Sequence, residues 1–422
     1  MPSLPHSLRA LRHRNFRLFL AGQIVSLAGT WMQSVALSWL VYRLTRSPFL
    51  LGLVGFAGQV PSLVLAPIAG VWADHGNRRR IILATQTLAM VQALLLAALV
   101  LTGRITVPHV LALSVFLGLV NGFDIPTRQA FLVEMVTGRE DLANAIALNS
   151  SVFNAARLVG PAIAGVMIGL FGEGTVFLLN GLSYVAVLGA LLAMQVPPRA
   201  VPRGRGDPMA RKLTEGFRYA FGFPPIRALI LLVAVVSLMG VPFTVLLPVF
   251  ATEVLGGGAN TLGFLMAASG VGALTGALYL AGRRTVSGLG HVILAAVAVF
   301  GASLLGLGAS TRLALSLAAL FGAGLGMMVQ MASSNTILQT IVDDDKRGRV
   351  MSFYSMAFMG SVPFGSLLAG VLASRIGAPR TVMLGGTACL IAAVVFARAL
   401  PALRAQVRPI YVRLGIVPEV PV

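Results

Sequence analysis

The chain has 422 residues, of which 57% are hydrophobic and only 11% are charged, and its formal net charge is +19 at pH 7. Because soluble proteins carry about a quarter charged residues, this composition excludes an ordinary soluble domain. The basic residues lie in the breaks between apolar runs rather than on one folded face, which argues against a nucleic-acid partner. Cys389 is the only cysteine, so an internal disulfide or a cysteine-based metal site is excluded.

Apolar runs long enough to cross a bilayer follow one another along the whole chain. A hydrocarbon core needs about 20 apolar residues per helix. The first run continues to about Tyr42, which is too long for the core of a signal peptide, so we interpret it as a retained helix. We predict an all-α membrane protein with twelve transmembrane helices, at residues 16–42, 48–72, 81–102, 107–129, 143–170, 174–196, 226–250, 259–281, 290–309, 312–337, 350–373 and 379–399.

The distribution of Lys and Arg predicts that both termini face the cytoplasm. With that orientation, the cytoplasmic loops and helix ends hold most of the 32 basic residues, as the positive-inside rule requires. The predicted external loops hold few basic residues, namely Arg43, Arg46, Arg104, Arg312, Arg375 and Arg380.

The longest polar stretch, residues 197–225, divides the chain into two six-helix halves. Its first part is rich in Pro, Gly and Arg and is typical of a flexible linker, whereas residues 209–221 have the spacing of an amphipathic helix at the inner leaflet. The spacing of Gly160, Gly165 and Gly172 recurs in the second half at Gly365, Gly370 and Gly377. We therefore predict pseudo-symmetric halves, with residues 1–196 and 226–400 forming the bundles and residues 401–422 a cytoplasmic tail.

A charged motif, "GVWADHGNRRR", joins the second and third predicted helices at residues 70–80. A glycine, an acid and a basic cluster in this order resemble the loop motif of the major facilitator superfamily, with His75 and Asn77 as departures. The resemblance implies that Asp74 faces the start of helix eleven, where its carboxylate meets a helix N-terminus. The alternative is that the arginines only follow the positive-inside rule, which leaves Asp74 unexplained. We interpret the following residues as a cytoplasmic latch: Gly70, Asp74, Arg78, Arg79, Arg80, Glu134 and Met351.

The stretch "RLVGPAIAG" in predicted helix five contains Arg157, Gly160, Pro161 and Gly165. It resembles the helix-five motif of exporters in this superfamily, although Ala156 stands where the first glycine is common. Small residues allow close helix packing and Pro161 favours a bend. The alternative is ordinary small-residue packing. The resemblance covers nearly the whole chain, is greatest to the branch of enterobactin and macrolide exporters, and implies outward transport.

Two ionisable positions lie inside the predicted spans. Asp124 shares a helix face with Asn121 and Arg128, and we take Asp124 and Arg128 as candidates for proton coupling. Alternatively, these two residues form a structural pair at the inner interface. Arg157 falls near the midplane, and its planar fork suits carboxylate, catecholate or phosphate oxygens of a substrate. The alternative for Arg157 is a pair with Asp124 or with a backbone carbonyl.

Polar residues at steps of three and four mark the helices that line the path in the major facilitator fold. Such stripes fit a water-accessible cavity, although they also serve as contacts between packed helices. The candidate substrate-binding residues are Gln23, Thr30, Gln33, Gln59, Asn121, Asn154, Arg157, Gln330, Ser334 and Asn335.

These features together predict a secondary active exporter in the bacterial plasma (inner) membrane, monomeric and multi-pass. It would move a small amphiphilic or anionic molecule out of the cytoplasm by alternating access, with protons as coupling ions and with no cofactor or metal ion. No lysine follows a glycine, so a phosphate-binding P-loop is excluded. The helices supply almost no convergent catalytic groups, which argues against an enzyme. An importer of the same fold and a lipid translocase remain as alternatives.

Overall fold

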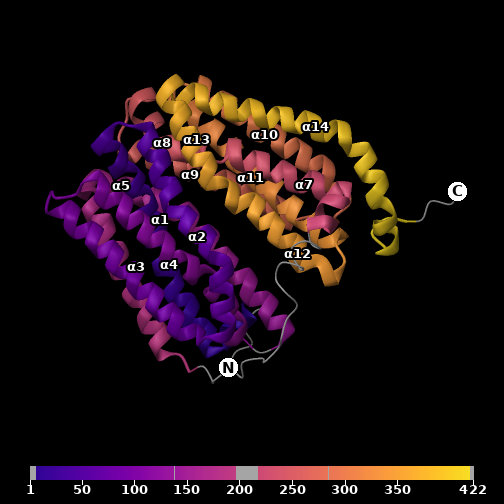
Figure 1. The fold of residues 1–422 in the computed structure, drawn as a ribbon, viewed down its shortest axis with the longest axis horizontal. Coiled ribbons are helices and arrows are strands. Elements are labelled where there is room, and N and C mark those ends of the chain that lie inside the picture. Colours follow the sequence, from indigo (N-terminus) through magenta and orange to yellow (C-terminus); the bar gives the residue numbers. More distant parts are fainter. Residues whose placement is uncertain (1–5, 137, 196–216, 284, 419–422) are drawn as a thin grey trace. The chain divides into compact units, whose positions relative to one another are not determined.

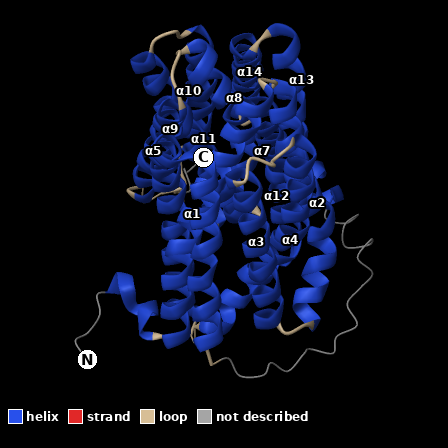
Figure 2. Cartoon of the chain, turned by 90° about the vertical axis from the view of Figure 1, so that its left-hand side faces the viewer, coloured by secondary structure: helices blue, strands red, loops and turns tan. Residues whose placement is uncertain are grey.

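The computed structural model describes residues 6–136, 138–195, 217–283 and 285–418. Within these ranges every regular element is a helix, and short loops join the helices (Figure 2). The all-α prediction is therefore confirmed. The chain divides into two compact units, of which unit 1 comprises residues 1–203 and 257–267 and unit 2 comprises residues 204–256 and 268–422.

Unit 1 holds the first half of the helices, drawn from indigo to magenta in Figure 1. In this unit α1 packs mainly against α5, and α2 packs mainly against α4. The elements are the 3₁₀ helix η1 (His6–Arg12), α1 (Arg14–Thr45), α2 (Pro48–His75), α3 (Arg78–Leu101), α4 (Val107–Leu132), the 3₁₀ turn η2 (Val133–Met135) and α5 (Arg139–Ala193).

Unit 2 holds most of the remaining helices, and the first two turns of α9 belong to unit 1. Within unit 2, α10 packs against both α11 and α14. The elements after the linker are α7 (Pro224–Val235), the π-helix η3 (Val236–Gly240), α8 (Phe243–Val249), the π-helix η4 (Phe250–Val254), α9 (Ala259–Ala281), α10 (Leu289–Ala309), α11 (Leu313–Ile341), α12 (Asp344–Ser355), the π-helix η5 (Met356–Gly360), α13 (Ser361–Ile376) and α14 (Ala378–Arg413).

A break at one glycine explains why the structure shows 11 long apolar helices among the described residues where the sequence predicts twelve spans. The described residues contain 11 helical stretches that are long and apolar enough to cross a membrane, one of which is Glu140–Ala193. That stretch is interrupted at Gly172, whose φ of 77° and ψ of 170° are not helical. Because side chains disfavour a positive φ, a glycine is the natural residue at this break. The break separates two spans, as expected at residues 143–170 and 174–196.

Several helices extend beyond the predicted membrane spans, and the extensions have a common cause. The structure starts α5 at Arg139 and α12 at Asp344, several residues before the expected positions, and α14 continues to Arg413. Hydropathy marks where a chain leaves the hydrocarbon, whereas a helix ends where its backbone hydrogen bonds end. Charged residues start α5 and α12 ahead of their apolar runs, and arginines are interspersed in the last turns of α14.

The expected single helix at residues 226–250 is also not continuous. Its α-helical geometry is interrupted by η3 and resumes in α8 after Pro242. A proline has no backbone N–H and its ring crowds the preceding turn, so the backbone adjusts locally. Hydropathy alone does not register such a change, because the residues of the interruption remain apolar.

Glycines allow helix backbones to approach one another in both units. In unit 1, a Cβ atom on Gly118 of α4 would lie 2.6 Å from the carbonyl oxygen of Gly58 in α2. In unit 2, a Cβ atom on Gly301 of α10 would lie 2.8 Å from the carbonyl oxygen of Gly386 in α14. Such contacts are how helices gain packing energy in lipid, where apolar burial offers little. They set the helix positions on which the site depends.

Candidate functional site

Arg157 on α5 is a positive charge without a carboxylate partner. Its Cζ atom lies 5.8 Å from the centroid of the Trp31 ring on α1, and Trp31 makes an edge-to-face contact with Phe153 at 5.8 Å. Among the described residues, the Arg157 guanidinium has no hydrogen bond and no ion pair. The face of the Trp31 ring therefore stabilises the cation while the N–H donors of its planar guanidinium stay available.

Asp124 on α4, by contrast, is buried and fully engaged. Its Oδ1 atom accepts hydrogen bonds from Thr85 Oγ1 and Gln86 Nε2 at 2.8 Å each, and its Oδ2 atom lies 2.5 Å from an Arg128 guanidinium nitrogen. Arg128 also donates to Gln23 Oε1 at 3.0 Å. The expected alternative of an Arg157–Asp124 pair is therefore wrong, because the carboxylate is already taken by α3 and by Arg128. Thr85 and Gln86, one helix away, were not anticipated.

A second polar network involves Gln33, which we expected to face a cavity. Gln33 Nε2 donates to Gln92 Oε1 at 3.0 Å, and Asn180 Nδ2 donates to Gln33 Oε1 at 2.8 Å. All three side chains are buried. The network joins α1, α3 and the second span of α5, so Gln33 serves contacts between helices in this structure. Gln92 and Asn180 were missed because their helices are not among the expected lining helices, although an amide inside an apolar run is itself a signal.

The other candidates of the first half keep at least part of their polar atoms free for further contacts. Thr30 and Gln59 are exposed and donate to carbonyls of their own helices, and half-buried Asn154 does the same. Asn121 is half-buried, and buried Gln23 holds Arg128 while its own Nε2 atom has no partner in the described residues.

The candidates of the second half lie on α11 in unit 2. Gln330 and Ser334 are completely buried, and Gln330 Nε2 donates to Ser334 Oγ at 3.4 Å. The Gln330 Oε1 atom has no partner among the described residues. Asn335 is half-buried and accepts a short hydrogen bond from Gln339. Gln330 is thus the member of this group with an unused buried acceptor.

The glycines of the "RLVGPAIAG" stretch place α5 against its neighbours. A Cβ atom on Gly165 would lie 2.7 Å from Gly263 Cα in the first turns of α9, and one on Gly263 would lie 3.2 Å from the carbonyl oxygen of Pro161. A Cβ atom on Gly160 would lie 2.6 Å from Trp31 Cβ. Gly160 therefore brings Trp31 close to α5, one turn from Arg157.

At the start of α3, the basic cluster of the 70–80 motif binds the ends of two other helices. Arg78 pairs with Glu134 at 2.9 Å, and Arg79 donates to the carbonyls of Leu191 and Leu192 near the end of α5. Asn77, where a glycine is common, caps α3 by accepting from the backbone N–H of Arg80 at 3.1 Å.

The remaining members of the expected latch are less informative. Gly70 lies within α2, Met351 lies within α12, and the Arg80 side chain is exposed. The side chain of Asp74 lies outside the described part of the structure. Its contact with the start of the eleventh predicted membrane span, residues 350–373, stays a prediction.

Comparison with known families decides what kind of protein carries this site. A model of the major facilitator superfamily family described as transmembrane secretion effector matches residues 6–410. The chain belongs to this family. It is therefore a membrane transport protein and not an enzyme, as its composition and its helices indicated.

Curated relatives of this transporter cover nearly its whole length. It is 24% identical to the staphyloferrin A transporter of Staphylococcus aureus over 90% of this chain and 95% of the relative. It is 28% identical to the multidrug efflux pump Tap of Mycolicibacterium fortuitum over 85% and 89% of the two chains. It is 22% identical to macrolide efflux protein A of Streptococcus pyogenes over 90% and 94%.

Solved structures share the fold at low identity. A bacterial homologue of the human lysosomal transporter Spinster matches with a TM-score of 0.69 and 16% identity, over 96% of this chain and 98% of that one. The nucleoside transporter NupG matches with a TM-score of 0.70 and 11% identity, over 91% and 99%. The prediction of a major facilitator fold is therefore confirmed.

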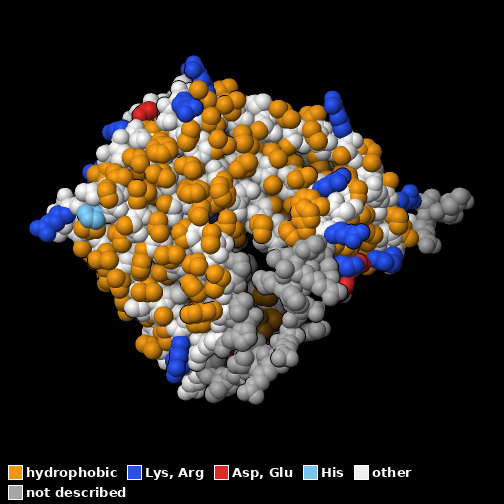
Figure 3. Space-filling model, in the orientation of Figure 1, with side chains coloured by type: hydrophobic (Ala, Val, Ile, Leu, Met, Phe, Trp, Pro, Cys, Tyr) orange, Lys and Arg blue, Asp and Glu red, His pale blue; other side chains and the backbone are white. Residues whose placement is uncertain are grey.

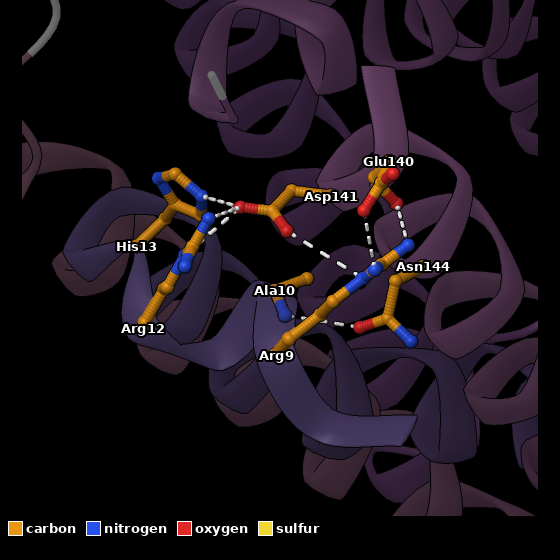
Figure 4. Close-up of polar contacts among 7 residues, drawn as sticks. All are labelled: Arg9, Ala10, Arg12, His13, Glu140, Asp141 and Asn144. Carbon is orange, nitrogen blue, oxygen red and sulfur yellow. Dashed lines mark hydrogen bonds and ion pairs between the residues drawn. The ribbon is translucent and has the colours of Figure 1, made fainter. Parts of the chain in front are cut away.

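The transporter also has a polar cluster that the sequence did not reveal, between the N-terminal segment and the start of α5 (Figure 4). Asp141 accepts from Arg12 Nε at 2.9 Å and lies 2.7 Å from His13 Nε2, and Arg9 pairs with Glu140 at 2.9 Å. The backbone N–H of Ala10 donates to Asn144 Oδ1. The sequence did contain a signal for this cluster. Acidic residues at the start of a helix and a basic N-terminal segment could have been predicted to form ion pairs.

Unit 2 has a smaller cluster at the corresponding point. Residues 217–222, which precede α7, are helical, and Tyr219 donates to Asp343 Oδ2 at 3.3 Å. Lys346 lies 4.6 Å from the centroid of the Tyr219 ring and 3.8 Å from Asp343. Burial raises the pKa of Tyr219 above its usual value. The rest of the predicted linker, up to residue 216, lies outside the described residues.

Proposed function

We propose that this transporter exports a small, anionic or oxygen-rich amphiphile from the cytoplasm across the bacterial inner membrane, as a monomer with both termini in the cytoplasm. The observation that carries the proposal is Arg157, a guanidinium inside a membrane helix that lies over the Trp31 ring and has no hydrogen bond or ion pair within the described residues. An arginine at such a depth is costly unless it meets water, a partner or a ligand. A substrate carboxylate, catecholate or phosphate would supply the missing acceptors.

The surroundings of Arg157 favour a ligand that is both anionic and apolar. Trp31 and Phe153 present aromatic surface next to the guanidinium, and Thr30 and Asn154 lie on the same two helices. Ligand sites of this kind combine a mostly apolar lining with few polar groups that fix orientation. Trp31 therefore joins the candidate substrate-binding residues.

Outward transport is supported by the glycine stretch of α5 and by two of the relatives. The printed names of Tap and of macrolide efflux protein A describe efflux. The close approach of Gly165 to Gly263 corresponds to the helix packing that we expected for the exporter motif.

For energy coupling, we propose proton antiport through Asp124 and Arg128. Protonation of the Asp124 carboxylate would abolish its ion pair with Arg128 and leave the guanidinium with its bond to Gln23. A buried pair that one proton can break links protonation to the packing of α3 and α4. The proton would thus change the contacts that α4, one of the expected lining helices, makes with α3.

We propose that the 70–80 motif closes the cytoplasmic side. In this proposal Asp74 faces the start of the eleventh predicted membrane span, residues 350–373. The contacts of Arg78 and Arg79 support this role, because they hold the start of α3 to the ends of α4 and α5. The side chain of Asp74 would then complete the latch near Met351. Asp74→Asn should slow transport and leave ligand binding to the detergent-solubilised protein unchanged.

The first experiment identifies ligands. Purified protein is screened by thermal shift against siderophores, macrolides and lipophilic drugs, because a ligand that binds the folded state raises Tm. Arg157→Ala should abolish the shift by anionic ligands, Arg157→Lys should retain part of it, and Arg104→Ala at the exposed loop should retain it fully. Unchanged shifts in both Arg157 variants would refute the ligand role of this residue.

The second experiment tests direction and coupling in proteoliposomes of known orientation. Export predicts that the ligand leaves the compartment on the cytoplasmic side when the opposite compartment is made acidic. Asp124→Asn should abolish the effect of the proton gradient. Flux in the opposite direction would identify an importer, and movement of a fluorescent phospholipid would identify a lipid translocase.

A further inference from the structure

Helix α14 is longer than a membrane crossing requires. It runs over 36 residues, Ala378–Arg413, whereas about 20 suffice for a hydrocarbon core. Arg380 and Arg398 are both exposed, and a rise of 1.5 Å per residue places them about 27 Å apart, close to the thickness of that core. The helix therefore leaves the hydrocarbon near Arg398 and continues beyond it.

The same two faces persist on both sides of this boundary. The buried face packs on unit 2 without a change of phase, through Cys389, Ala393, Phe396, Leu400, Leu403 and Val407. The opposite face presents Ile391 and Val395, which are 60% and 61% exposed, and then Arg398 one turn later. Because Ile391 and Val395 face lipid, Arg398 lies on the lipid-facing side where the apolar stripe ends.

Arginines continue along the exposed part of the helix. Arg404 and Arg408 are exposed, and within the described residues neither they nor Arg398 have an ion pair or a hydrogen bond. Arg413, at the end of the helix, lies 3.9 Å from Asp343. The helix itself contains no Asp or Glu. Figure 3 shows Lys and Arg side chains gathered on the side where Figure 1 places the end of α14.

We propose that Arg398, Arg404 and Arg408 form a binding surface for the phosphate groups of anionic phospholipids. Basic residues next to a membrane helix attract anionic headgroups, and the attraction falls off within a Debye length, about 8 Å at physiological salt. A long arginine side chain at the end of an apolar stripe reaches the headgroup layer. Its guanidinium then binds phosphate oxygens through charge-assisted hydrogen bonds.

The positive-inside rule accounts for arginines on this side of the membrane but not for their placement. It counts charges in loops and does not require them to follow the lipid-facing stripe of a packed helix. Here Arg398 directly ends that stripe, Arg404 and Arg408 follow on the next exposed turns of the helix, and all three lack acidic partners in the described structure, whereas Arg413 has Asp343 nearby. The arrangement also predicts a gradient, because Arg398 is nearest to the headgroups and Arg408 is farthest from them.

The test measures binding of phosphatidylglycerol to the purified full-length transporter, by native mass spectrometry and by the rise in Tm that the lipid causes. The double variant R398Q/R404Q is compared with R375Q/R380Q, which removes two exposed arginines from the opposite end of the same unit. We expect R398Q/R404Q to lose about half or more of the phosphatidylglycerol-dependent rise, and the control pair to keep it. Phosphatidylcholine should have the same effect on both variants.

Two further measurements distinguish a loss of lipid binding from a folding defect in the variant. R398K/R404K keeps the charge and should keep the stabilisation by phosphatidylglycerol, and added salt should weaken that stabilisation in the unmodified protein. Among single variants, R398Q should have a larger effect than R408Q. Equal lipid-dependent shifts in R398Q/R404Q and R375Q/R380Q, or equal stabilisation by phosphatidylcholine and phosphatidylglycerol, would overturn the proposal.

Discussion

Asp124 and Arg157 both carry charge into apolar helices of unit 1, yet their surroundings differ. Asp124 is held by Thr85, Gln86 and Arg128, so its two oxygens are satisfied by the protein. Arg157 lies over the ring of Trp31 and has no hydrogen bond or ion pair in the described part of the chain. A charge with a full set of partners holds helices together as long as it stays ionised, whereas a charge without acceptors is available to a ligand. Two ionisable residues in apolar membrane helices therefore have different roles, one in contacts between helices and one in ligand binding.

The largest expected effect comes from breaking the satisfied pair. Arg128→Leu leaves the Asp124 carboxylate buried without its cation, and removing one partner of a buried pair costs about 3–5 kcal/mol. We expect a marked fall in Tm. The double variant D124L/R128L should recover much of it, because no buried charge remains. If the stability losses of the two single substitutions simply add in the double variant, Asp124 and Arg128 are not coupled. Asp124 would then not differ from Arg157 in having a stabilising partner.

A substitution at Gly160 should disturb the Arg157 site and leave the Asp124 network intact. A Cβ atom there would lie 2.6 Å from Trp31 Cβ, and overpacking of this kind costs about 1–3 kcal/mol. We expect Gly160→Val to displace Trp31, change its fluorescence and remove ligand-induced stabilisation. Gly189→Val is the matched control, because a Cβ atom at Gly189 in α5 meets nothing within 4 Å.

Removing the unpartnered charge should have little effect on the empty protein. Arg157→Ala deletes no hydrogen bond within the described structure, so the free energy of unfolding should change by about 1 kcal/mol or less. The ligand-induced rise in Tm should disappear. A loss of stability without ligand as large as that of Arg128→Leu would mean that Arg157 is a framework residue as well.

The smallest effect is expected at Trp31. Trp31→Phe keeps an aromatic face beneath the guanidinium but weakens the cation–π contact, which contributes about 0.5–1 kcal/mol at exposed sites and more when desolvated. We expect a severalfold weaker ligand affinity by titrated thermal shift, and Trp31→Leu should weaken it further. Equal affinities in all three proteins would show that the ring does not position Arg157.

The sequence determined the features that depend on local pattern. Hydropathy over about 20 residues located the spans, the helical repeat brought Asp124 and Arg128 to one face, and the glycine stretch marked the helix that packs closely. These properties need no knowledge of which helices are neighbours. The break at Gly172 was anticipated for the same reason, since a polar turn interrupts an apolar run.

Only the tertiary structure decided which side chains meet. The partners of Asp124 on α3, the amides that hold Gln33 and the ring beneath Arg157 come from other helices. A membrane helix is apolar around most of its circumference, so its sequence does not specify its rotation or its neighbours. Those follow from the packing of all helices together, and this packing gave Asp124 its partners and left Arg157 with a tryptophan.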